Sequence, residues 1–393
     1  MSKKSLLYAS PFPPQKSGIS DYSVELAHAL EKHFDVTLFT ENYKVKHSLI
    51  ANLPVVRYGV DEIDFDKYDY LVYNVGNNPD FHSYIYEAAL AHPGMIILHD
   101  YMLYYLFVGY YQRKRQLYSK LYNATGTETF LKMKHIIKKN GSNLLEQKGN
   151  AGIAPFNDEL LASGNKIMVH SEYARKRILD TGLVSEDKVR KINQLYYSEY
   201  EGKKSINKDL LYAKFNIPKD AVIIASFGFI AETKLNKEVC RVVKELSKDS
   251  DKKLCYVMVG EGNYADSELE EGKVIKTGYT NIDEFNSFID HADIIVSLRG
   301  VSMGETSGAM IRIFQYGKCC ITNGGGWFSE LPDDSVIKIE LDDVEKNLKE
   351  ALSDLLLNDD KKRSYEKNAR AFIERDNAPD VVSEHIKAFL EES

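Results

Sequence analysis

The stretch Ser297–Asp334 reads SLRGVSMGETSGAMIRIFQYGKCCITNGGGWFSELPDD. An apolar run ends at Leu298, a polar loop with glycines follows, and a helical pattern begins at about Ser307. Gly317 stands where this helix should end, and a second apolar run covers Cys319–Thr322. A strand, a helix and a second strand in this order form a βαβ unit, whose two strands are parallel. The stretch therefore predicts an α/β fold with a parallel sheet.

The same alternation of short apolar runs and helical patterns extends in both directions along the chain. In the first half we expect strands at Ser5–Ser10, Val36–Thr40, Pro54–Tyr58, Tyr70–Val75, Met95–His99 and Lys166–His170. In the second half we expect strands at Val222–Gly228, Leu254–Gly260, Val274–Thr277, Ile294–Leu298, Cys319–Thr322 and Val336–Ile339. Two series of strands that alternate with helices predict two Rossmann-like domains.

A polar segment, Ser198–Lys208, separates the two series of strands and marks the expected domain boundary. A length of 393 residues also suits two domains better than one. We therefore expect an N-terminal domain over residues 1–200, a second domain over residues 201–375, and a C-terminal helix over residues 376–393. The last segment carries an apolar stripe made of Val381, Val382, Ile386, Phe389 and Leu390.

The composition is that of a folded protein without an export signal. Hydrophobic residues make up 44% of the chain and charged residues 28%, which excludes a disordered or fibrous protein. Prolines interrupt the apolar stretch near the N-terminus, and no run is long enough to span a membrane. The four cysteines lack the spacing of a zinc site, and three of them lie in apolar runs. We therefore expect reduced thiols in a cytoplasmic protein.

Charge is distributed unevenly along the chain. The net charge is −7, but residues 101–148 hold two acidic residues against the basic residues Arg113, Lys114, Arg115, Lys120, Lys132, Lys134, Lys138, Lys139 and Lys148. Over residues 104–139 the basic residues alternate with aromatic ones at spacings that suit amphipathic helices. This segment is expected either to bind an anionic membrane surface or to form a solvated face. The negative net charge argues against nucleic acid as a partner.

In the first half, the loops that follow three of the strands carry candidate ligand-binding residues. Gly18 would let backbone N–H groups approach an anion at the start of a helix near Ser20, the alternative being an ordinary turn capped by Ser20. His82, His99 and Asp100 lie at or just after strand ends. Because ligands bind at the carboxyl edge of parallel sheets, these three are candidates for contacts with a sugar, a phosphate or an acceptor. A structural or capping role is the alternative for each histidine.

In the second half, Lys234 lies six residues after the strand end at Gly228. A lysine there can place its charge on a diphosphate leaving group, and a solvated surface lysine is the alternative. Glu305 lies in a polar loop at a helix start, where a carboxylate can bind the hydroxyls of a polyhydroxylated ligand. Loop amides and a guanidinium can bind phosphate in the same loop. The candidate phosphate-binding residues are therefore Arg299, Gly304, Thr306, Ser307 and Gly308.

Several segments resemble, in the same order, the motifs of glycosyltransferase family 4, especially a subgroup with a GETSG loop. They are the Gly18 loop, the His99 segment, FGFIAETK, VMVGEGN, TGYT, GETSG and YGKCCITN, and together they cover nearly the whole chain. The resemblance implies the GT-B fold, in which two Rossmann-like domains face each other across a cleft and a C-terminal helix packs back on the first. It implies metal-independent, retaining transfer from a UDP- or GDP-linked sugar. By this similarity His99 contacts the donor sugar, Lys234 the diphosphate and Glu305 the sugar hydroxyls.

The sequence departs from the family pattern at two positions. Phe229 stands where the family usually has an arginine that contacts the diphosphate, and Arg299 is the candidate to replace it. Arg312 stands where the family usually has a second glutamate that holds the nucleotide ribose, and the spacing is one residue short. These departures leave the ribose contact unassigned and weaken the assignment of the leaving-group contacts.

We therefore expect a glycosyltransferase that moves a sugar from a nucleotide diphosphate to a lipid-linked, saccharide or protein acceptor, in the synthesis of cell-surface polysaccharide, glycolipid or glycoprotein. No obvious nucleophile accompanies Glu305, so we expect substitution on the face from which the diphosphate leaves. We expect no cofactor and no metal, because the two Asp-x-Asp runs, Asp64–Asp66 and Asp249–Asp251, lie in acidic stretches that resemble loops. The alternatives are a GT-B nucleotide-sugar epimerase and a non-catalytic partner subunit.

Overall fold

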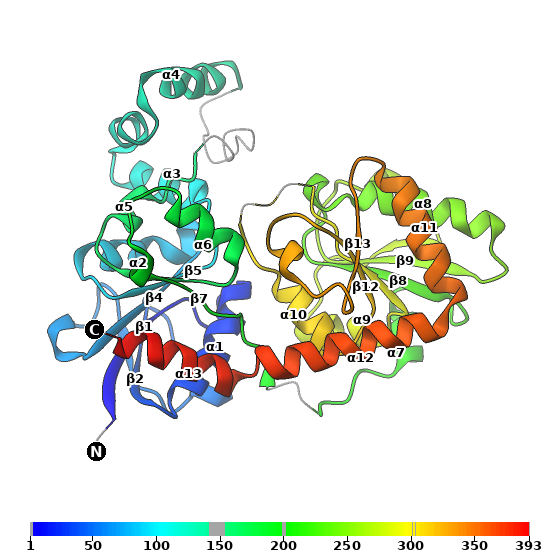
Figure 1. The fold of residues 1–393 in the computed structure, drawn as a ribbon, viewed down its shortest axis with the longest axis horizontal. Helices are drawn as coiled ribbons and strands as arrows, with labels where there is room; N and C mark the ends of the chain where they lie inside the picture. The colour runs from blue at the N-terminus through cyan, green and yellow to red at the C-terminus, as the bar shows by residue number, and fades with distance from the viewer. Residues whose placement is uncertain (1–2, 141–153, 199–201, 301, 303, 393) are drawn as a thin grey trace. The chain divides into compact units, whose positions relative to one another are not determined.

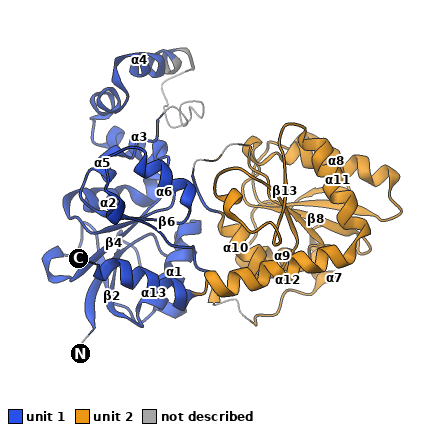
Figure 2. Cartoon of the chain, in the orientation of Figure 1, with its two compact units in different colours: residues 1–195, 303–306, 379–393 blue, residues 196–302, 307–378 orange. Residues whose placement is uncertain are grey.

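The computed structural model describes residues 3–140, 154–198, 202–300, 302 and 304–392. The chain forms two compact units (Figure 2). Unit 1 comprises Met1–Leu195, Met303–Thr306 and Pro379–Ser393, and unit 2 comprises Tyr196–Ser302 and Ser307–Ala378. The expected boundary at residue 200, the residue Lys148 and the side chain of Lys139 lie outside the described part of the chain.

Unit 1 contains a parallel sheet of seven strands in the order β3-β2-β1-β4-β5-β6-β7 (Figure 1). The strands are β1 Lys4–Ala9, β2 Phe34–Thr40, β3 Val55–Arg57, β4 Tyr70–Val75, β5 Met95–Leu98, β6 Lys166–Val169 and β7 Val189–Lys191. The strand order reverses between β1 and β4, which is where open α/β sheets bind their ligands. The first six strands agree with the prediction to within two residues at each end. The short strand β7 was missed, because VRK offers no apolar run.

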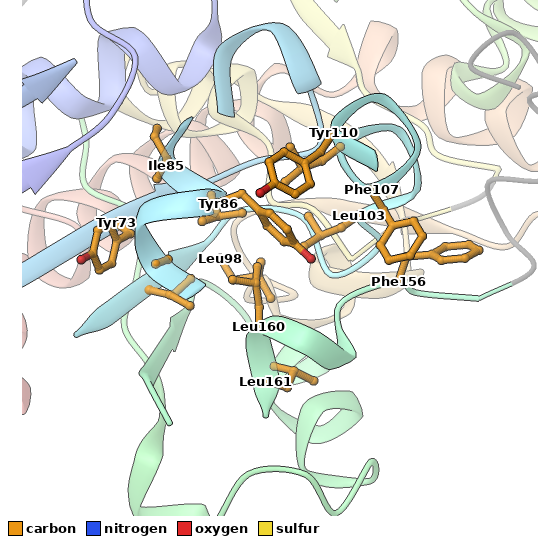
Figure 3. Close-up of a cluster of buried hydrophobic side chains, with 14 of the residues drawn as sticks. Tyr73, Ile85, Tyr86, Leu98, Leu103, Phe107, Tyr110, Phe156, Leu160 and Leu161 are labelled. Carbon is orange, nitrogen blue, oxygen red and sulfur yellow. The ribbon is translucent and has the colours of Figure 1, made fainter. Parts of the chain in front are cut away.

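The helices of unit 1 cover both faces of this sheet. They are α1 Gly18–Leu30, α2 Pro79–Ala91, α3 Tyr104–Arg113, α4 Leu117–Asn140, α5 Asp158–Leu161, α6 Glu172–Leu179 and α13 Pro379–Glu391. Successive side chains of β1 enter opposite cores, Leu7 and Ala9 on one face and Leu6 and Tyr8 on the other. Figure 3 shows the first of these cores, which includes Tyr73, Ile85, Tyr86, Leu98, Leu103, Phe107, Tyr110, Phe156, Leu160 and Leu161.

The C-terminal helix α13 is part of unit 1, as the fold expected from the sequence requires. Its apolar stripe is buried beside α1 in the second core of that unit, through Val382, Ile386, Phe389 and Leu390. Lys166 Nζ donates a hydrogen bond to the carbonyl oxygen of Phe389 over 2.8 Å. Arg190 forms a two-pronged ion pair with Glu392, with the nearer N–O distance 2.6 Å. The helix therefore packs back on the first set of strands.

Unit 2 contains a parallel sheet of six strands in the order β10-β9-β8-β11-β12-β13. The strands are β8 Val222–Phe227, β9 Leu254–Val259, β10 Val274–Lys276, β11 Ile294–Val296, β12 Cys320–Asn323 and β13 Ile337–Ile339. The strand order reverses between β8 and β11. The helices are α7 Lys208–Lys214, α8 Asn236–Asp249, α9 Ile282–His291, α10 Gly308–Gln315, α11 Val344–Leu357 and α12 Asp359–Asp376. All six strands were predicted, and Gly317 ends α10 as expected.

The basic segment forms α3 and α4, and α4 extends beyond α3 on the side away from the sheet of unit 1 (Figure 1). The helix α4 bends sharply at Gly126, whose φ is +70° and ψ is 176°. One of its faces is buried in the core of unit 1 through Leu117, Leu121 and Met133. Among the described residues, no helix is both long enough and apolar enough to cross a membrane.

Candidate functional site

The loop after β1 leads directly into α1. Ser17, and not Ser20, caps this helix, because the Ser17 side chain accepts a hydrogen bond from the backbone N–H of Ile19. Ser20 lies in the first turn and is buried. Gly18 is the first residue of α1, and a Cβ there would meet no atom within 4 Å. The alternative of a turn capped by Ser20 is therefore wrong as to the capping residue, because the helix begins two residues before the expected start near Ser20.

Asn74, near the end of β4, holds two of the predicted histidines in place. Its side-chain oxygen accepts a hydrogen bond from His99 Nε2 over 3.0 Å, and its side-chain nitrogen donates to Ser23 Oγ over 3.2 Å and to the Tyr8 hydroxyl. Its backbone oxygen accepts from His82 Nδ1 over 3.0 Å. Asn74 is fully buried, so this network is shielded from water. One side chain of β4 thus orients histidines from α2 and from the end of β5.

The network also fixes the tautomers of these histidines. An amide oxygen and a carbonyl oxygen can only accept, so His99 carries its hydrogen on Nε2 and His82 carries its hydrogen on Nδ1. Burial lowers the pKa of His82 to about 4, against the opposing effect of the hydrogen bond to Asn74. Burial also lowers the pKa of His99 well below 6.5, and His170 and His82 nearby add to this effect. Both rings are therefore neutral at pH 7, and each retains one nitrogen that can accept a hydroxyl proton.

A third histidine, His170, belongs to the same cluster and was not named as a site residue from the sequence. It follows β6, and its ring centroid lies 5.2 Å from that of His99. The edge of the Tyr22 ring contacts both imidazoles, at centroid distances of 4.8 Å and 5.3 Å. His170 Nδ1 donates to the Ile192 carbonyl over 2.9 Å, while Nε2 is buried without a hydrogen-bond partner among the described residues. Burial lowers the pKa of His170 to about 4. Its position directly after a strand was the signal that could have revealed it.

Asp100 comes two residues after the end of β5 and accepts a hydrogen bond from the backbone N–H of Asn77 over 2.9 Å. Burial raises the pKa of Asp100 to about 6, and the neighbouring carboxylate of Glu305 adds to this rise while the Asn77 bond opposes it. Asp100 and His82 line a cavity of about 360 Å³ in unit 1. The other lining residues are Lys16, Ser17, Ile19, Asn77, Asn78 and Phe81. The structure thus brings these two predicted residues together at one cavity.

Glu305 and its neighbours pack with unit 1, although the sequence grouped them with the second half. Gly304 has a φ of +85°, and a Cβ at this position would lie 2.5 Å from the Cβ of Tyr101. Thr306 Oγ1 donates a hydrogen bond to the side-chain oxygen of Gln194 over 2.8 Å. Only glycine fits this approach to Tyr101, and the loop therefore holds the Glu305 carboxylate close enough to Asp100 to influence its pKa.

In unit 2, Lys234 lies against the end of β8. Its ammonium group donates a hydrogen bond to the carbonyl oxygen of Phe227 over 2.8 Å. A Cβ at Gly228 would lie only 2.6 Å from Lys234 Nζ, and Gly228 has a φ of +89°. The lysine thus folds back over a glycine at the carboxyl edge of the sheet, and its charge is fixed there. Its place after the end of β8 agrees with the position expected from the sequence.

The loops around Lys234 approach one another through their backbones. A Cβ at Gly260, in the loop after β9, would lie 2.2 Å from the carbonyl oxygen of Gly228. The backbone N–H of Gly300 donates to the carbonyl of Thr233 over 2.9 Å, which joins the loop after β11 to the loop after β8. The apolar run at Leu254–Gly260 predicts the strand β9, but nothing in it reveals this close approach of Gly260 to another loop.

Arg299 follows β11 and is held by Asn323 from β12. The Asn323 side chain accepts from the Arg299 N–H over 2.7 Å and donates to the Arg299 carbonyl over 3.0 Å. The Arg299 guanidinium lies 5.8 Å from the ring centroid of Phe328. Ser307 caps α10 by accepting a hydrogen bond from the Met310 N–H, and Gly308 is the first residue of that helix. Arg299 and Lys234 therefore follow neighbouring strands of one sheet.

The two positions that depart from the family pattern have different surroundings. Phe229 is 61% exposed beside Gly228, at the end of β8. Arg312 is only 4% exposed, and its guanidinium lies 3.6 Å from the ring centroid of Tyr197. Arg312 is thus a buried cation of α10 that stacks on an aromatic ring in the interior of unit 2, and it is not exposed to solvent.

Comparisons with known proteins address the fold. No protein-family model matches the chain, and no curated protein sequence matches it. HepE from Anabaena, solved with UDP and glucose, aligns with a TM-score of 0.65 at 9% identity over 98% of this chain and 99% of that chain. WaaG, a glycosyltransferase involved in lipopolysaccharide biosynthesis, aligns with a TM-score of 0.61 at 11% identity over 99% and 100%. This chain has the GT-B fold.

The expected fold class, with two Rossmann-like domains and a returning C-terminal helix, is therefore confirmed. GT-B neighbours differ in the reaction that their names give. A protein from Listeria monocytogenes described as a UDP-N-acetylglucosamine 2-epimerase aligns with a TM-score of 0.57 at 10% identity over 100% of this chain and 96% of that chain. The GT-B fold alone does not select the reaction, and the residues at the strand ends must do so.

Proposed function

We propose that this protein is a retaining glycosyltransferase of family 4, GETSG-loop subgroup, that uses a nucleotide diphosphate sugar as donor. The observation that carries the proposal is the set of loops at the carboxyl edge of unit 2, where the Lys234 ammonium is fixed over Gly228. A fixed cation and closely packed backbone suit a diphosphate leaving group. The structural neighbour HepE was solved with UDP-glucose, which supports a donor of the same class.

Six of the predicted residues have a role in this reaction. Lys234 and Arg299 neutralise the diphosphate, and the amides of Ser307 and Gly308 at the start of α10 bind its oxygens. Glu305 and neutral His99 accept hydrogen bonds from hydroxyls of the donor sugar. These cations take the place of a metal ion, so the reaction is metal-independent.

The chemistry is a substitution at the anomeric carbon of the donor. The bond from that carbon to the diphosphate oxygen breaks, and the electron pair leaves on the diphosphate. The acceptor oxygen bonds to the same carbon from the side of departure, and its proton passes to a phosphate oxygen. Stabilisation of the developing charge on the diphosphate is the protein's largest contribution.

We also propose that the enzyme works in the cytoplasm, at an anionic membrane surface, and that α4 makes the contact. Tyr118, Tyr122 and Leu131 of α4 are 54%, 48% and 56% exposed. Such aromatic and apolar side chains beside basic ones favour a membrane boundary. An acceptor linked to a lipid would be reached there.

Much of the basic charge of this segment is already paired with acids inside unit 1. Arg113 pairs with Asp80, Lys114 with Glu87, Lys120 with Glu159 and Lys132 with Glu128. Arg115, Lys134 and Lys138 are exposed and form no ion pair among the described residues. Within the described part of this segment, the attraction to an anionic surface therefore rests on these three cations.

The decisive experiment combines ligand binding with turnover. UDP, GDP and their sugars are tested for an increase in melting temperature, since a ligand that binds only the folded state raises it. Release of the diphosphate and the transferred sugar is then measured with the stabilising donor. Lys234→Ala and Glu305→Ala should each lower turnover at least tenfold, on a scale of roughly 2 to 4 kcal/mol for one such contact. Lys219→Ala, at an exposed lysine of unit 2, is the matched control.

Three outcomes would overturn the proposal. Absence of stabilisation by every nucleotide would remove the donor site, and normal turnover in a folded Lys234→Ala variant would remove the leaving-group contact. An epimerised nucleotide sugar formed without any acceptor would replace transfer by the reaction named for the Listeria neighbour. Strong inhibition by EDTA that Mg²⁺ or Mn²⁺ reverses would contradict the metal-independent mechanism.

A further inference from the structure

The cavity of unit 1 lies where the strand order of its sheet reverses. Lys16, Ser17 and Ile19 bound it at the start of α1, Asn77, Asn78, Phe81 and His82 bound it at the start of α2, and Asp100 bounds it after β5. Its volume is about 360 Å³, in the range of pockets that hold small ligands. Every one of these residues belongs to unit 1, so the cavity is complete within that unit.

The polar side chains of this cavity are held in fixed positions by the starts of two helices. Asn78 caps α2 by accepting from the Asp80 N–H over 2.9 Å. The Asn77 side-chain oxygen accepts from the N–H groups of Tyr105 and Leu106, over 2.9 Å and 3.2 Å, at the start of α3. These bonds occupy the amide oxygens and leave the amide nitrogens as the groups that can donate to a ligand. The cavity therefore offers rigid donors next to the Asp100 carboxylate.

An aromatic ring completes the lining. Phe81 is half-buried and lines the cavity beside His82. His82 donates through Nδ1 to Asn74, so its Nε2 is an acceptor. A carboxylate, two amides and an imidazole acceptor match the alternating hydroxyls of a sugar ring, and an aromatic face matches the C–H groups of that ring. A lipid tail would leave these polar groups without partners, which is costly in a half-enclosed site.

We propose that this cavity binds the terminal sugar ring of the acceptor, with Phe81 against its C–H face and Asp100 accepting from one of its hydroxyls. The identification of that sugar as the acceptor rests on the transferase function proposed above. The cavity thus narrows the acceptor class to molecules that end in a saccharide, and it makes Phe81 a determinant of acceptor specificity.

The charges around the cavity favour an uncharged sugar. Asp100 lies close to the carboxylate of Glu305, and Lys16 is the single cation among the eight lining residues. A phosphate group placed beside Asp100 would meet a carboxylate pair, and this repulsion weakens binding. A neutral hexose should therefore bind more tightly than the same hexose with a phosphate at carbon 6.

The test measures the binding of methyl glycosides of common hexoses to the full chain by saturation-transfer NMR and calorimetry, without any donor. The best ligand of wild type should bind Phe81→Leu at least tenfold more weakly, because leucine retains bulk but has no ring. Phe81→Tyr should restore binding. Asp100→Asn should also weaken binding, and glucose should bind better than glucose 6-phosphate. Leu183→Ala, which removes an exposed apolar side chain of the same unit, is the matched control.

Folding of each variant is checked by its melting curve. The inference is overturned if wild type binds none of the glycosides, if a folded Phe81→Leu variant binds as tightly as wild type, or if the phosphorylated sugar binds better. The proposed function fails in a different way, through absence of stabilisation by UDP or GDP while the glycosides still bind. Loss of glycoside binding with retained nucleotide binding would instead remove only the cavity's role.

Discussion

Each unit has a parallel sheet, and the carboxyl edges of the two sheets are formed by different kinds of groups. In unit 1 the edge is formed by buried side chains, with Asn74 orienting His82 and His99 and with His170 behind them. In unit 2 it is formed by backbone segments that pack closely together. Gly260 packs against the backbone of Gly228, and the Lys234 ammonium lies next to Gly228.

This difference matches the two ligands that a transferase must bind. Backbone amides and helix starts carry fixed partial charges that do not titrate, which suits the constant negative charge of a diphosphate. Oriented imidazoles, amides and a carboxylate distinguish hydroxyl patterns, but their protonation depends on pH. We therefore expect unit 2 to be sensitive to backbone substitutions and unit 1 to be sensitive to acid.

The largest effect is expected from Gly260→Ala. Its Cβ would lie 2.2 Å from the carbonyl oxygen of Gly228 and 2.8 Å from the carbonyl carbon, at a φ of +154°. Two backbone segments cannot separate without moving the Lys234 loop, so UDP or GDP binding should be lost and unit 2 destabilised by several kcal/mol. Calorimetry with the nucleotide and thermal unfolding measure the two effects.

Gly272→Ala is the matched control for this substitution. Gly272 also has a positive φ, of +70°, but a Cβ there would meet only the Pro218 side chain, at 3.5 Å. It should cost about 1 kcal/mol of stability and leave nucleotide binding intact. Equal nucleotide affinity in the two variants would show that the backbone approach does not shape the donor site.

A smaller effect is expected from acid, and it should act on unit 1. Burial holds the pKa of His82 and of His170 at about 4 in the folded protein, against an ordinary value of 6.5. The folded state therefore binds fewer protons than the unfolded state between these values, so stability rises with pH across this window and is fully present above 6.5. Each histidine contributes roughly 3 kcal/mol at pH 7 on the scale of 1.36 kcal/mol per pKa unit.

Asp100 acts in the opposite direction. Its pKa of about 6 is above its ordinary value of 3.8, so its contribution is present below 3.8 and is lost as pH rises through 6. His99, whose pKa is also lowered, acts with the other two histidines, and the three together outweigh one carboxyl. Urea unfolding of wild type should show lower stability at pH 5 than at pH 8.

His170→Asn tests the assignment. Asparagine can still donate to the Ile192 carbonyl but cannot take a proton, so the difference in stability between pH 5 and pH 8 should shrink by roughly 2 kcal/mol, because about 1.5 pKa units of the shift lie in this window. His385→Asn, at an exposed histidine of α13, is the control. An unchanged pH difference in His170→Asn would place the acid sensitivity elsewhere.

Local patterns in the sequence were enough to predict much of this arrangement. Apolar runs separated by helical patterns located twelve strands, and the rule that ligands bind after parallel strands selected His99, Asp100 and Lys234. These features depend on residues that are close together along the chain. The strand β7 could not be predicted in this way, because two of its three residues are charged and it contains no apolar run.

What could not be predicted depends on residues that are distant in sequence. The contact of Gly304 with Tyr101 joins loops about two hundred positions apart, and it determines that Glu305 packs in unit 1. The role of Asn74 is equally hidden, because its partners come from β1, α1, α2 and the end of β5. The basic segment was read as free charge, since nothing near Arg113 in the sequence reveals its partner Asp80.

The smallest effect is expected at the membrane, where α4 distinguishes unit 1 from unit 2. The chain should sediment at low salt with vesicles that contain anionic lipid, and salt should release it, because each basic group near such a surface contributes about 1 kcal/mol and is screened over a Debye length.

The variant to test reverses Arg115, Lys134 and Lys138 to glutamate. Reversal of Arg113 or Lys114 would also break ion pairs inside unit 1 and confuse the result. Lys367→Glu in unit 2 is the matched control, since it changes an exposed lysine that forms no ion pair among the described residues. The triple variant should remain in the supernatant while nucleotide binding persists. If wild type itself stays in the supernatant at low salt, α4 does not bind membranes, and a soluble saccharide becomes the acceptor to test in the cavity beside Phe81.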